Sequence, residues 1–298
     1  MTSYVALGDS ITVGMGDPMP DESWRGWAAL LASAMPHLDF HNLAISGALI
    51  RDVEREQLPR ALELRPAVVS VVAGVNDTLR RTFDVAAIAA SLAHTVGALR
   101  AAGATVLTMR LPDPGRMFGL PGTLARPLAR RIRAVNAVAD AMAARFATLH
   151  FDVAGHPATY ERRMWSVDRL HPSERGHRLL ARSYCALLEL PPLQWPGAEP
   201  SSPPPTRRAQ VGWMATKGTR WMIDRSQDLV PYMLHMMVAE WWYGLRGTAE
   251  RLDATILQET AAAVSAQPAP SGADPEEPPS TLVPWLAPMD APLTNSDR

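Results

Sequence analysis

The segment YVALGDSITVGMGD, residues 4–17, decides the fold class of this 298-residue chain. Its first four residues are aromatic, β-branched or apolar, which is typical of a buried strand, and the run ends at Gly8. Asp9 and Ser10 follow at once, in a loop that contains two further glycines. A serine at the end of a core strand is most often a turn residue or a helix N-cap. A larger role for Ser10 depends on the residues that the rest of the chain brings to it.

Strand-like and helix-like stretches alternate along most of the chain. Strands are predicted at 4–7, 39–43, 67–73, 105–109 and 148–152, and helices near 24–35, 49–63, 84–102, 123–146 and 173–189. The third strand, AVVSVVA, is apolar or small almost throughout, as a strand covered on both faces is. This alternation predicts βαβ units with right-handed crossovers. We therefore expect a three-layer α/β/α domain with about five mostly parallel strands, which binds ligands at the carboxyl ends of the strands.

Composition narrows the class of protein. Hydrophobic residues make up 47% of the chain, and the net charge of −1 argues against a nucleic-acid partner. Cys185 is the only cysteine, so the chain forms no internal disulfide, and its apolar surroundings predict a packing role. The sequence shows no signal peptide and no run of about 20 apolar residues. We expect a cytoplasmic protein.

The alternating pattern fills residues 1–190 and then ends. Residues 191–210 are rich in proline and serine and predict a linker. Residues 211–257 are rich in tryptophan, methionine and leucine at spacings of three and four, which predicts one or two amphipathic helices with Pro231 at a start or a kink. Residues 262–298 have the composition of a disordered tail.

Three roles are open for the segment 211–257. It can pack on the α/β domain or on a second copy of the chain, which would make a homo-oligomer contact. It can lie on a lipid headgroup layer as a peripheral membrane contact, because tryptophan and leucine beside basic residues suit an interfacial helix. It can also cover an acyl-binding groove, because methionine-rich surfaces adapt to varied apolar ligands.

Residues that suit hydrolysis follow four of the five predicted strands. Ser10 follows the first, Gly47 in NLAISG the second, Asn76 in AGVND the third, and Asp168 and His171 in WSVDRLHP the fifth. A serine nucleophile needs a base, which His171 can be, and Asp168 can orient the imidazole. The backbone N–H groups of Ser10 and Gly47 and the amide of Asn76 can form an oxyanion hole.

In this order, GDSITVGMGD, NLAISGA, GVND and DRLHP resemble the four sequence blocks of the SGNH (GDSL-type) hydrolase family, a family of serine esterases and lipases. The resemblance covers the alternating part of the chain and implies a flavodoxin-like SGNH hydrolase fold. It implies Ser10 as nucleophile, Asp168 and His171 as its partners, and an oxyanion hole of Ser10, Gly47 and Asn76. The first block reads G-D-S-I where the family name has leucine. The chain has no G-x-S-x-G motif, which disfavours the ordinary α/β-hydrolase fold.

Other polar residues near the blocks receive structural interpretations. We expect Asp9 to hold its loop by hydrogen bonds, Asp77 to cap the following helix and His177 to be structural. Arg51 and Arg80 lie just past the second and third blocks, where they are either solvated helix charges or contacts for a polar substrate.

The sequence thus predicts a hydrolase that cleaves carboxylic esters of small-molecule substrates through an acyl-enzyme intermediate, with no cofactor and no metal. An acyltransferase with the same triad is an alternative, and so is a non-catalytic lipid-binding or scaffold protein of the same fold. The resemblance implies short-chain esters, acetylated sugars, thioesters or lysophospholipids as substrates.

Overall fold

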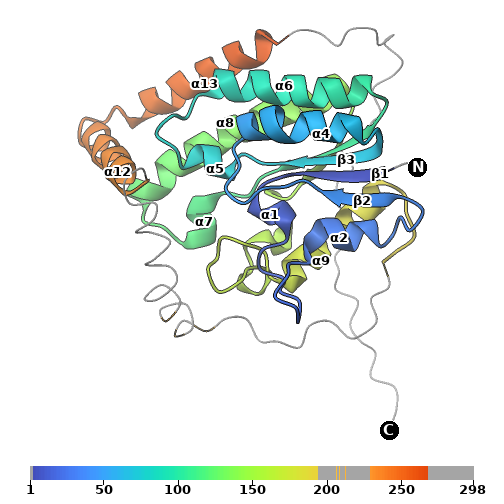
Figure 1. Ribbon diagram of the computed structural model, residues 1–298. Helices are drawn as coiled ribbons and strands as arrows, with labels where there is room; N and C mark the ends of the chain where they lie inside the picture. Colours follow the sequence, from blue (N-terminus) through green and yellow to red (C-terminus); the bar gives the residue numbers. More distant parts are fainter. Residues whose placement is uncertain (1–2, 194–205, 207, 209–211, 213–228, 268–298) are drawn as a thin grey trace.

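In the computed structural model, the described part of the chain contains one sheet of five parallel strands with helices on both faces (Figure 1). The structure describes residues 3–193, 206, 208, 212 and 229–267. The strands are β1 (Ser3–Gly8), β2 (Asp39–Asn42), β3 (Pro66–Val72), β4 (Thr105–Arg110) and β5 (Leu149–Asp152). Each strand end lies within one residue of its predicted position, and the α/β/α fold class is confirmed.

The helices that connect the strands cover both faces of the sheet. In Figure 1, α2 and α9 lie on one face, whereas α4, α6 and α8 lie on the other. The helical segments are α1 (Ser10–Val13), α2 (Gly26–Ala32), α3 (Ile50–Asp52), η1 (Val53–Gln57), α4 (Leu58–Glu63), α5 (Val75–Thr78), α6 (Val85–Ala101), α7 (Pro114–Phe118), α8 (Gly122–Phe146), η2 (Pro157–Tyr160), η3 (Arg162–Met164), α9 (Glu174–Leu187), α12 (Leu229–Leu245) and α13 (Ala249–Ser265).

The strand order β2-β1-β3-β4-β5 determines where a ligand can bind. β2 pairs with one edge of β1, and β3, the next strand in the sequence, pairs with the other edge of β1. In parallel sheets this reversal opens a crevice at the carboxyl ends of the two central strands. Ser10 lies two residues past the end of β1, and therefore at this crevice.

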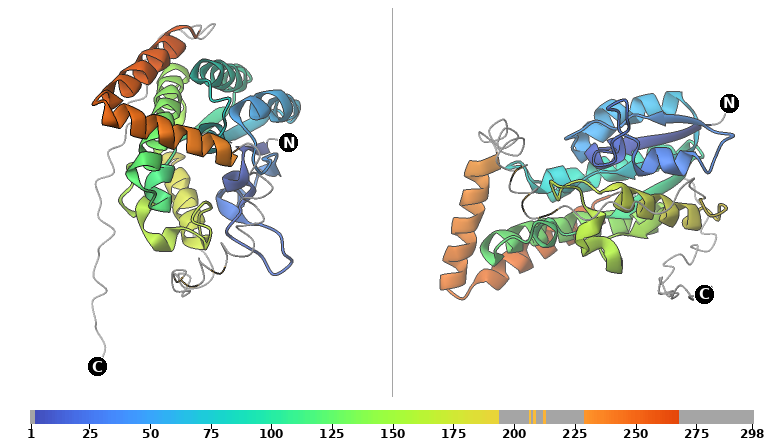
Figure 2. Two further views of the ribbon diagram at one scale, coloured as in Figure 1. Left: turned by 90° about the vertical axis from the view of Figure 1, so that its left-hand side faces the viewer. Right: turned by 90° about the horizontal axis from the view of Figure 1, so that it is seen from below.

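The described helices after the α/β domain are part of the fold. Figure 2 shows α12 and α13 meeting at a corner, and α13 packs along α6 and α8. Ala263 belongs to the hydrophobic core, and Arg145 donates hydrogen bonds to the carbonyl oxygens of Val264 and Gln267. These contacts satisfy the end of α13 in the way that basic side chains often satisfy a helix C-terminus.

The predicted boundaries of the C-terminal region need a correction. The helix continues past residue 257, and the tail predicted at 262–298 is wrong for its first residues because α13 runs to Ser265. The alanines at 261–263 favour helix and bury small side chains against the domain, whereas the proline-rich residues after them dominate the composition of the tail. Residues 268–298 and most of the predicted linker lie outside the described residues.

One face of α12 is apolar and exposed. Pro231 lies in the first turn of the helix, as predicted. The exposed apolar side chains at spacings of four and three are Leu234, Val238, Trp241 and Leu245. The opposite face packs on α8, which agrees with the first of the three expected roles, while the exposed face is the one that a lipid layer or a second copy would contact. Among the described helices, none combines the length and the apolar character that a membrane span requires.

Arg130 joins α8 to α12 through a buried ion pair and to α13 through a partly exposed one. Its Nη1 atom lies 3.1 Å from Glu240 Oε2, and its Nε atom lies 2.8 Å from Asp253 Oδ1. The side chains of Arg130 and Glu240 are only 10% and 2% exposed. A buried charge is tolerated only when it is paired, so this cluster fixes the position of the two helices.

Replacement of Arg130 by methionine is expected to lower the free energy of unfolding by about 3 kcal/mol, because Glu240 would stay buried without its partner. The matched control is Arg133→Met, since the Arg133 side chain is 62% exposed and pairs with Asp253 at the surface. That change should cost no more than about 1 kcal/mol. Urea unfolding followed by circular dichroism measures both values, and equal losses would show that the buried pair does not fix α12.

Candidate active site

The loop after β1 and the turn before α9 bring a serine, a histidine and an aspartate into one hydrogen-bonded chain. His171 Nε2 lies 2.9 Å from Ser10 Oγ, and His171 Nδ1 lies 2.7 Å from Asp168 Oδ2. Because an ionised carboxylate only accepts hydrogen bonds, Nδ1 of the histidine carries a proton. Nε2 is then left to accept the hydroxyl proton of Ser10.

Asp168 is surrounded by hydrogen-bond donors. Its Oδ1 atom accepts from the Ser166 hydroxyl at 2.5 Å and from the backbone N–H groups of Leu170 and His171 at 2.8 and 3.0 Å. Burial alone would raise the pKa of Asp168, but the hydrogen bond and charge of His171, with the Ser166 and backbone donors, hold the pKa below its usual value. The carboxylate therefore stays ionised and keeps the imidazole in one tautomer.

Gly16 allows the loop after β1 to touch the turn that carries the histidine. A Cβ atom on Gly16 would overlap the carbonyl oxygen of Pro172 and press on the His171 side chain. The φ of Gly16 is +101°, in the left-handed region that favours glycine. The close approach of Ser10 and His171 thus depends on a residue without a side chain.

His177 makes a second link between these segments. Its Nδ1 atom accepts the Trp27 N–H at 3.1 Å, so its Nε2 atom carries the proton and donates to Met15 O at 3.0 Å. Burial lowers the pKa of His177 to about 4. The imidazole is neutral and holds α9 against the loop after β1, which is the structural role predicted for it.

Two side chains hold the backbone next to Ser10. Gln57 Oε1 accepts the Gly8 N–H at 2.8 Å, and Gln57 Nε2 donates to the Gly8 carbonyl at 2.9 Å. Asp9 Oδ1 accepts the Ile11 N–H at 3.0 Å and caps α1, so Asp9 holds its loop as expected. Gln57 is the last residue of the π-helical turn η1, a local deviation that often occurs at functional sites.

The predicted oxyanion donors differ in their availability. Neither the Ser10 N–H nor the Gly47 N–H has an acceptor among the described residues. Asn76 Nδ2, in contrast, donates to Asp9 Oδ2 and to Ala48 O, both at 3.2 Å. These two long hydrogen bonds hold the amide in the site, and Asn76 must exchange one of them to donate to an oxyanion.

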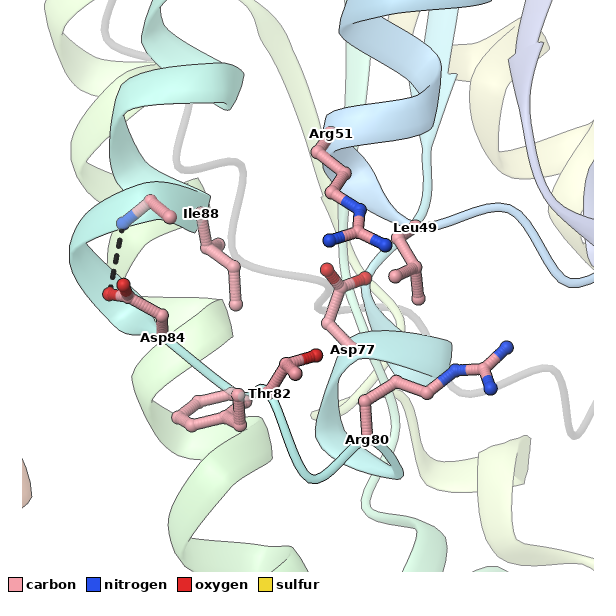
Figure 3. Close-up of a pocket in the computed structure, with 9 residues that line it drawn as sticks. Leu49, Arg51, Asp77, Arg80, Thr82, Asp84 and Ile88 are labelled. Atoms are coloured by element: carbon pink, nitrogen blue, oxygen red, sulfur yellow. Dashed lines mark hydrogen bonds between the residues drawn. The ribbon is translucent and has the colours of Figure 1, made fainter. Parts of the chain in front are cut away.

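A cavity of about 190 Å³ lies beyond Asn76, between α3, α5 and the start of α6 (Figure 3). In Figure 3, the Arg51 guanidinium points toward Asp77, whereas the Arg80 guanidinium points away from Asp77 and Thr82. Asp77 is buried, and its Oδ2 atom accepts the Ile50 N–H at 3.2 Å. Asp77 therefore caps α3, and the prediction that it caps the following helix is wrong, because the short turn of α5 directs its carboxylate back toward α3.

Two buried carboxyl groups flank Asn76 without a cationic hydrogen-bond partner among the described residues. Burial raises the pKa of Asp9 to about 6 and that of Asp77 to about 7. The hydrogen bonds from the Ile11 and Ile50 N–H groups and from the Asn76 amide offset part of this effect. Ionisation of either group is therefore unfavourable in the folded chain at slightly acidic pH.

In the sequence, Gly16 is noted only as one of two loop glycines, and two other supporting residues, Ser166 and Gln57, receive no predicted role. Gly16 belongs to the first block, and its repeat of the Gly14 pattern is a signal for close backbone approach. Ser166 lies two residues before Asp168, a spacing at which a hydroxyl can reach the carboxylate. Gln57 leaves no local signal, because its partner Gly8 is 49 residues away in sequence.

The sequence-based predictions also cover Cys185 and possible metal ligands. Cys185 is a buried free thiol, and burial raises its pKa to about 11, which fits the predicted packing role. In the part of the chain that the structure describes, no group of three or more histidine, cysteine, aspartate or glutamate side chains could hold a metal ion.

Comparison with known proteins assigns the chain to a family. Residues 6–179 match the model of the GDSL-like Lipase/Acylhydrolase family. A solved structure of a mutant of Axe2, an acetyl xylan esterase from Geobacillus stearothermophilus, has 19% identity and a TM-score of 0.51, over 66% of this chain and 97% of that chain. A structure of TesA has 28% identity and a TM-score of 0.48, over 63% of this chain and 98% of that chain. No curated protein sequence matches the chain significantly.

The two buried carboxyl groups are expected to lower the stability of the folded state as the pH rises from about 4 to about 7. His177, whose pKa falls from 6.5 to about 4 on burial, offsets part of this loss up to about pH 6.5. In this window the unfolded chain has released the two carboxyl protons near pH 4, whereas the folded chain retains them up to about pH 6 and 7. The folded state binds more protons, so raising the pH favours unfolding. Asp77→Asn removes one such group and should reduce this slope by up to about 1.4 kcal/mol per pH unit.

Urea unfolding at several pH values between 4 and 8 measures the slope. The matched control is Asp39→Asn, which changes an exposed carboxylate on β2 and should leave the slope of the wild type. A wild-type slope in Asp77→Asn would contradict the assignment.

Proposed function

Because the chain belongs to the GDSL-like lipase/acylhydrolase family, we propose that it is a serine hydrolase that cleaves small-molecule carboxylic esters through an acyl-enzyme intermediate. The observation that carries this proposal is the hydrogen-bonded chain from Asp168 through His171 to Ser10 at the carboxyl end of β1. It sets a hydroxyl 2.9 Å from an imidazole whose other nitrogen is held by an ionised carboxylate.

In the first step, Ser10 Oγ attacks the ester carbonyl carbon while its proton moves to His171 Nε2. Asp168 stabilises the imidazolium that forms. The negative charge on the carbonyl oxygen is held by the N–H groups of Ser10 and Gly47, which have no other acceptor among the described residues. Asn76 joins them by exchanging one of its 3.2 Å hydrogen bonds.

The intermediate then collapses. His171 returns its proton to the departing alcohol oxygen, the ester C–O bond breaks, and the acyl group stays on Ser10. His171 next takes a proton from a water molecule, whose oxygen attacks the acyl carbon and releases the acid. With an alcohol in place of that water the same residues would catalyse acyl transfer, and product analysis with a competing alcohol separates the two reactions.

A non-catalytic lipid-binding or scaffold protein would not need a serine that reacts. A fluorophosphonate probe, which labels activated serine nucleophiles, distinguishes that alternative from a hydrolase. The full chain is the appropriate material, because α13 contributes Ala263 to the core of the domain.

Ser10→Ala is expected to lower kcat/KM for 4-nitrophenyl esters by at least about 1000-fold and to abolish fluorophosphonate labelling, because the variant lacks the hydroxyl that lies 2.9 Å from His171 Nε2. Initial rates on esters from acetate to palmitate measure the effect. Ser33→Ala is the matched control, because the Ser33 hydroxyl donates to Leu30 O at the C-terminal end of α2 and makes no hydrogen bond to Ser10, Asp168 or His171. Full activity in a correctly folded Ser10→Ala variant would refute the role of Ser10.

Asn76→Ala is expected to lower kcat by about 100- to 1000-fold with a small change in KM, since an oxyanion donor acts mainly in the transition state. Steady-state kinetics on the best of the 4-nitrophenyl esters separates the two constants. A rise in KM at constant kcat would assign Asn76 to substrate binding instead.

A further inference from the structure

Each of the loops that follow β2, β3, β4 and β5 carries an arginine. Three of these arginines lie within eight residues of a site residue predicted from the sequence, and the fourth lies on α7. These arginines are Arg51, Arg80, Arg116 and Arg169. The Arg116 guanidinium carbon lies 3.5 Å from the centroid of the Tyr160 ring, and Arg51 Nε lies 3.4 Å from Asp52 Oδ1. The Arg169 side chain has no hydrogen bond, ion pair or ring contact with any residue that the structure describes.

The backbone conformation of Arg169 is also unfavourable. It lies in the turn between Asp168 and His171, and its φ is +57°, in the left-handed region. Glycine adopts this conformation freely, whereas arginine does not. Strain of this kind persists where the rest of the structure enforces it, and it gathers at functional sites. Arg169 shares this conformation with Arg65, so the case for a function of Arg169 rests on the surroundings of its side chain.

The guanidinium lies at the border between two loops of the site. A Cβ atom built on Gly119 would be 3.9 Å from Arg169 Nη1. Gly119 is exposed and ends α7, which belongs to the loop after β4. The Arg169 side chain therefore reaches from the turn that carries His171 to the opposite loop at the carboxyl edge of the sheet, and it is partly exposed there.

The nearby carboxylates are already occupied. Asp113 Oδ1 accepts hydrogen bonds from the N–H groups at the start of α7, at 2.7 and 3.3 Å. Asp168 accepts four hydrogen bonds within its own turn and from Ser166. The positive charge of Arg169 is thus left to attract an anion from outside the described residues.

We propose that Arg169 is a specificity-determining residue that binds a carboxylate or phosphate group of the ester substrate. A guanidinium stays charged at every physiological pH, and its planar donors match the two oxygens of such a group. The inference rests on the function proposed above, because it assigns Arg169 to the substrate of the Ser10 site.

The experiment compares charged and neutral esters of matched shape. Mono-4-nitrophenyl pimelate carries a carboxylate at the far end of its acyl group, and its methyl ester is the neutral partner. Butyrylglycerol 3-phosphate carries the anion on the alcohol side, with butyrylglycerol as its neutral partner. Release of 4-nitrophenol or of acid gives kcat/KM, and the two pairs show on which side of the ester the charge is bound.

The variants separate binding from folding. Arg169→Gly removes the guanidinium and relieves the backbone, and Arg169→Lys keeps the charge. The matched control is Arg65→Gly, which removes an exposed arginine with φ +45° just before β3, at the opposite edge of the sheet. Thermal unfolding should show an unchanged or raised Tm for both glycine variants, because glycine suits both positions.

The wild type is expected to prefer the anionic member of at least one pair by tenfold or more. Arg169→Gly should lose that preference without loss of Tm, Arg169→Lys should keep part of it, and Arg65→Gly should retain all of it. A merely structural arginine would change both members of a pair equally. Equal kcat/KM for the charged and neutral esters in the wild type, or a preference that survives Arg169→Gly, would overturn the proposal.

Failure of the proposed function has a different signature, since neither member of either pair would then be hydrolysed. Calorimetric titration with free pimelate and with glycerol 3-phosphate then decides the role of Arg169. Weaker binding by Arg169→Gly than by Arg65→Gly would support the anion site. Equal binding by the two variants, or none by the wild type, would overturn it.

Discussion

The hydrogen bond between Ser10 and His171 joins loops that are 161 residues apart in sequence, and the rest of the site depends on it. Neither loop could form it alone. The sheet brings the end of β1 to the crevice, and Gly16 removes the side chain that would keep the His171 turn at a distance. The neutral imidazole of His177 on α9 then accepts the Trp27 N–H and donates to Met15 O, which ties α9 to α2 and to the loop after β1. The approach of Ser10 to His171 is therefore set by the packing of the backbone around the two residues.

Much of this arrangement could be predicted because the signals are local. A parallel strand that is covered on both faces needs a nearly unbroken apolar run, and β1 and β3 stand out in the sequence for this reason, whereas β2 (DFHN) and β5 (LHFD) are partly polar edge strands. Ser10, Asn76 and His171 then follow strands whose carboxyl ends must share one edge. The structure brings Ser10, Asp168 and His171 within hydrogen-bonding distance, whereas the sequence alone predicts only that their loops meet.

The rest depends on partners that are distant in sequence. The helical pattern at 49–63 gives no sign of the π turn that directs Gln57 to Gly8. Asp77 has the spacing of a cap for the next helix, yet the nearer unsatisfied donor in space is the Ile50 N–H. The end of α13 is not apparent from the composition of the C-terminal region, because a much longer proline-rich segment follows its alanines. In each case the local sequence allows more than one structure, and a contact with a residue distant in sequence determines which one forms.

The electrostatics of the site follow from what lies on either side of Asn76. Asp9, with a pKa of about 6, is mostly ionised at neutral pH and accepts a hydrogen bond from the Asn76 amide. A second negative charge on a substrate oxygen would compete for that amide and be repelled by Asp9. The N–H groups of Ser10 and Gly47 carry no competing bond among the described residues, whereas Asn76 must give up one of its two hydrogen bonds before it can donate to a substrate oxygen. An anionic substrate would bring a further negative charge to the site, and the guanidinium of Arg169, which has no partner among the described residues, is placed to offset it.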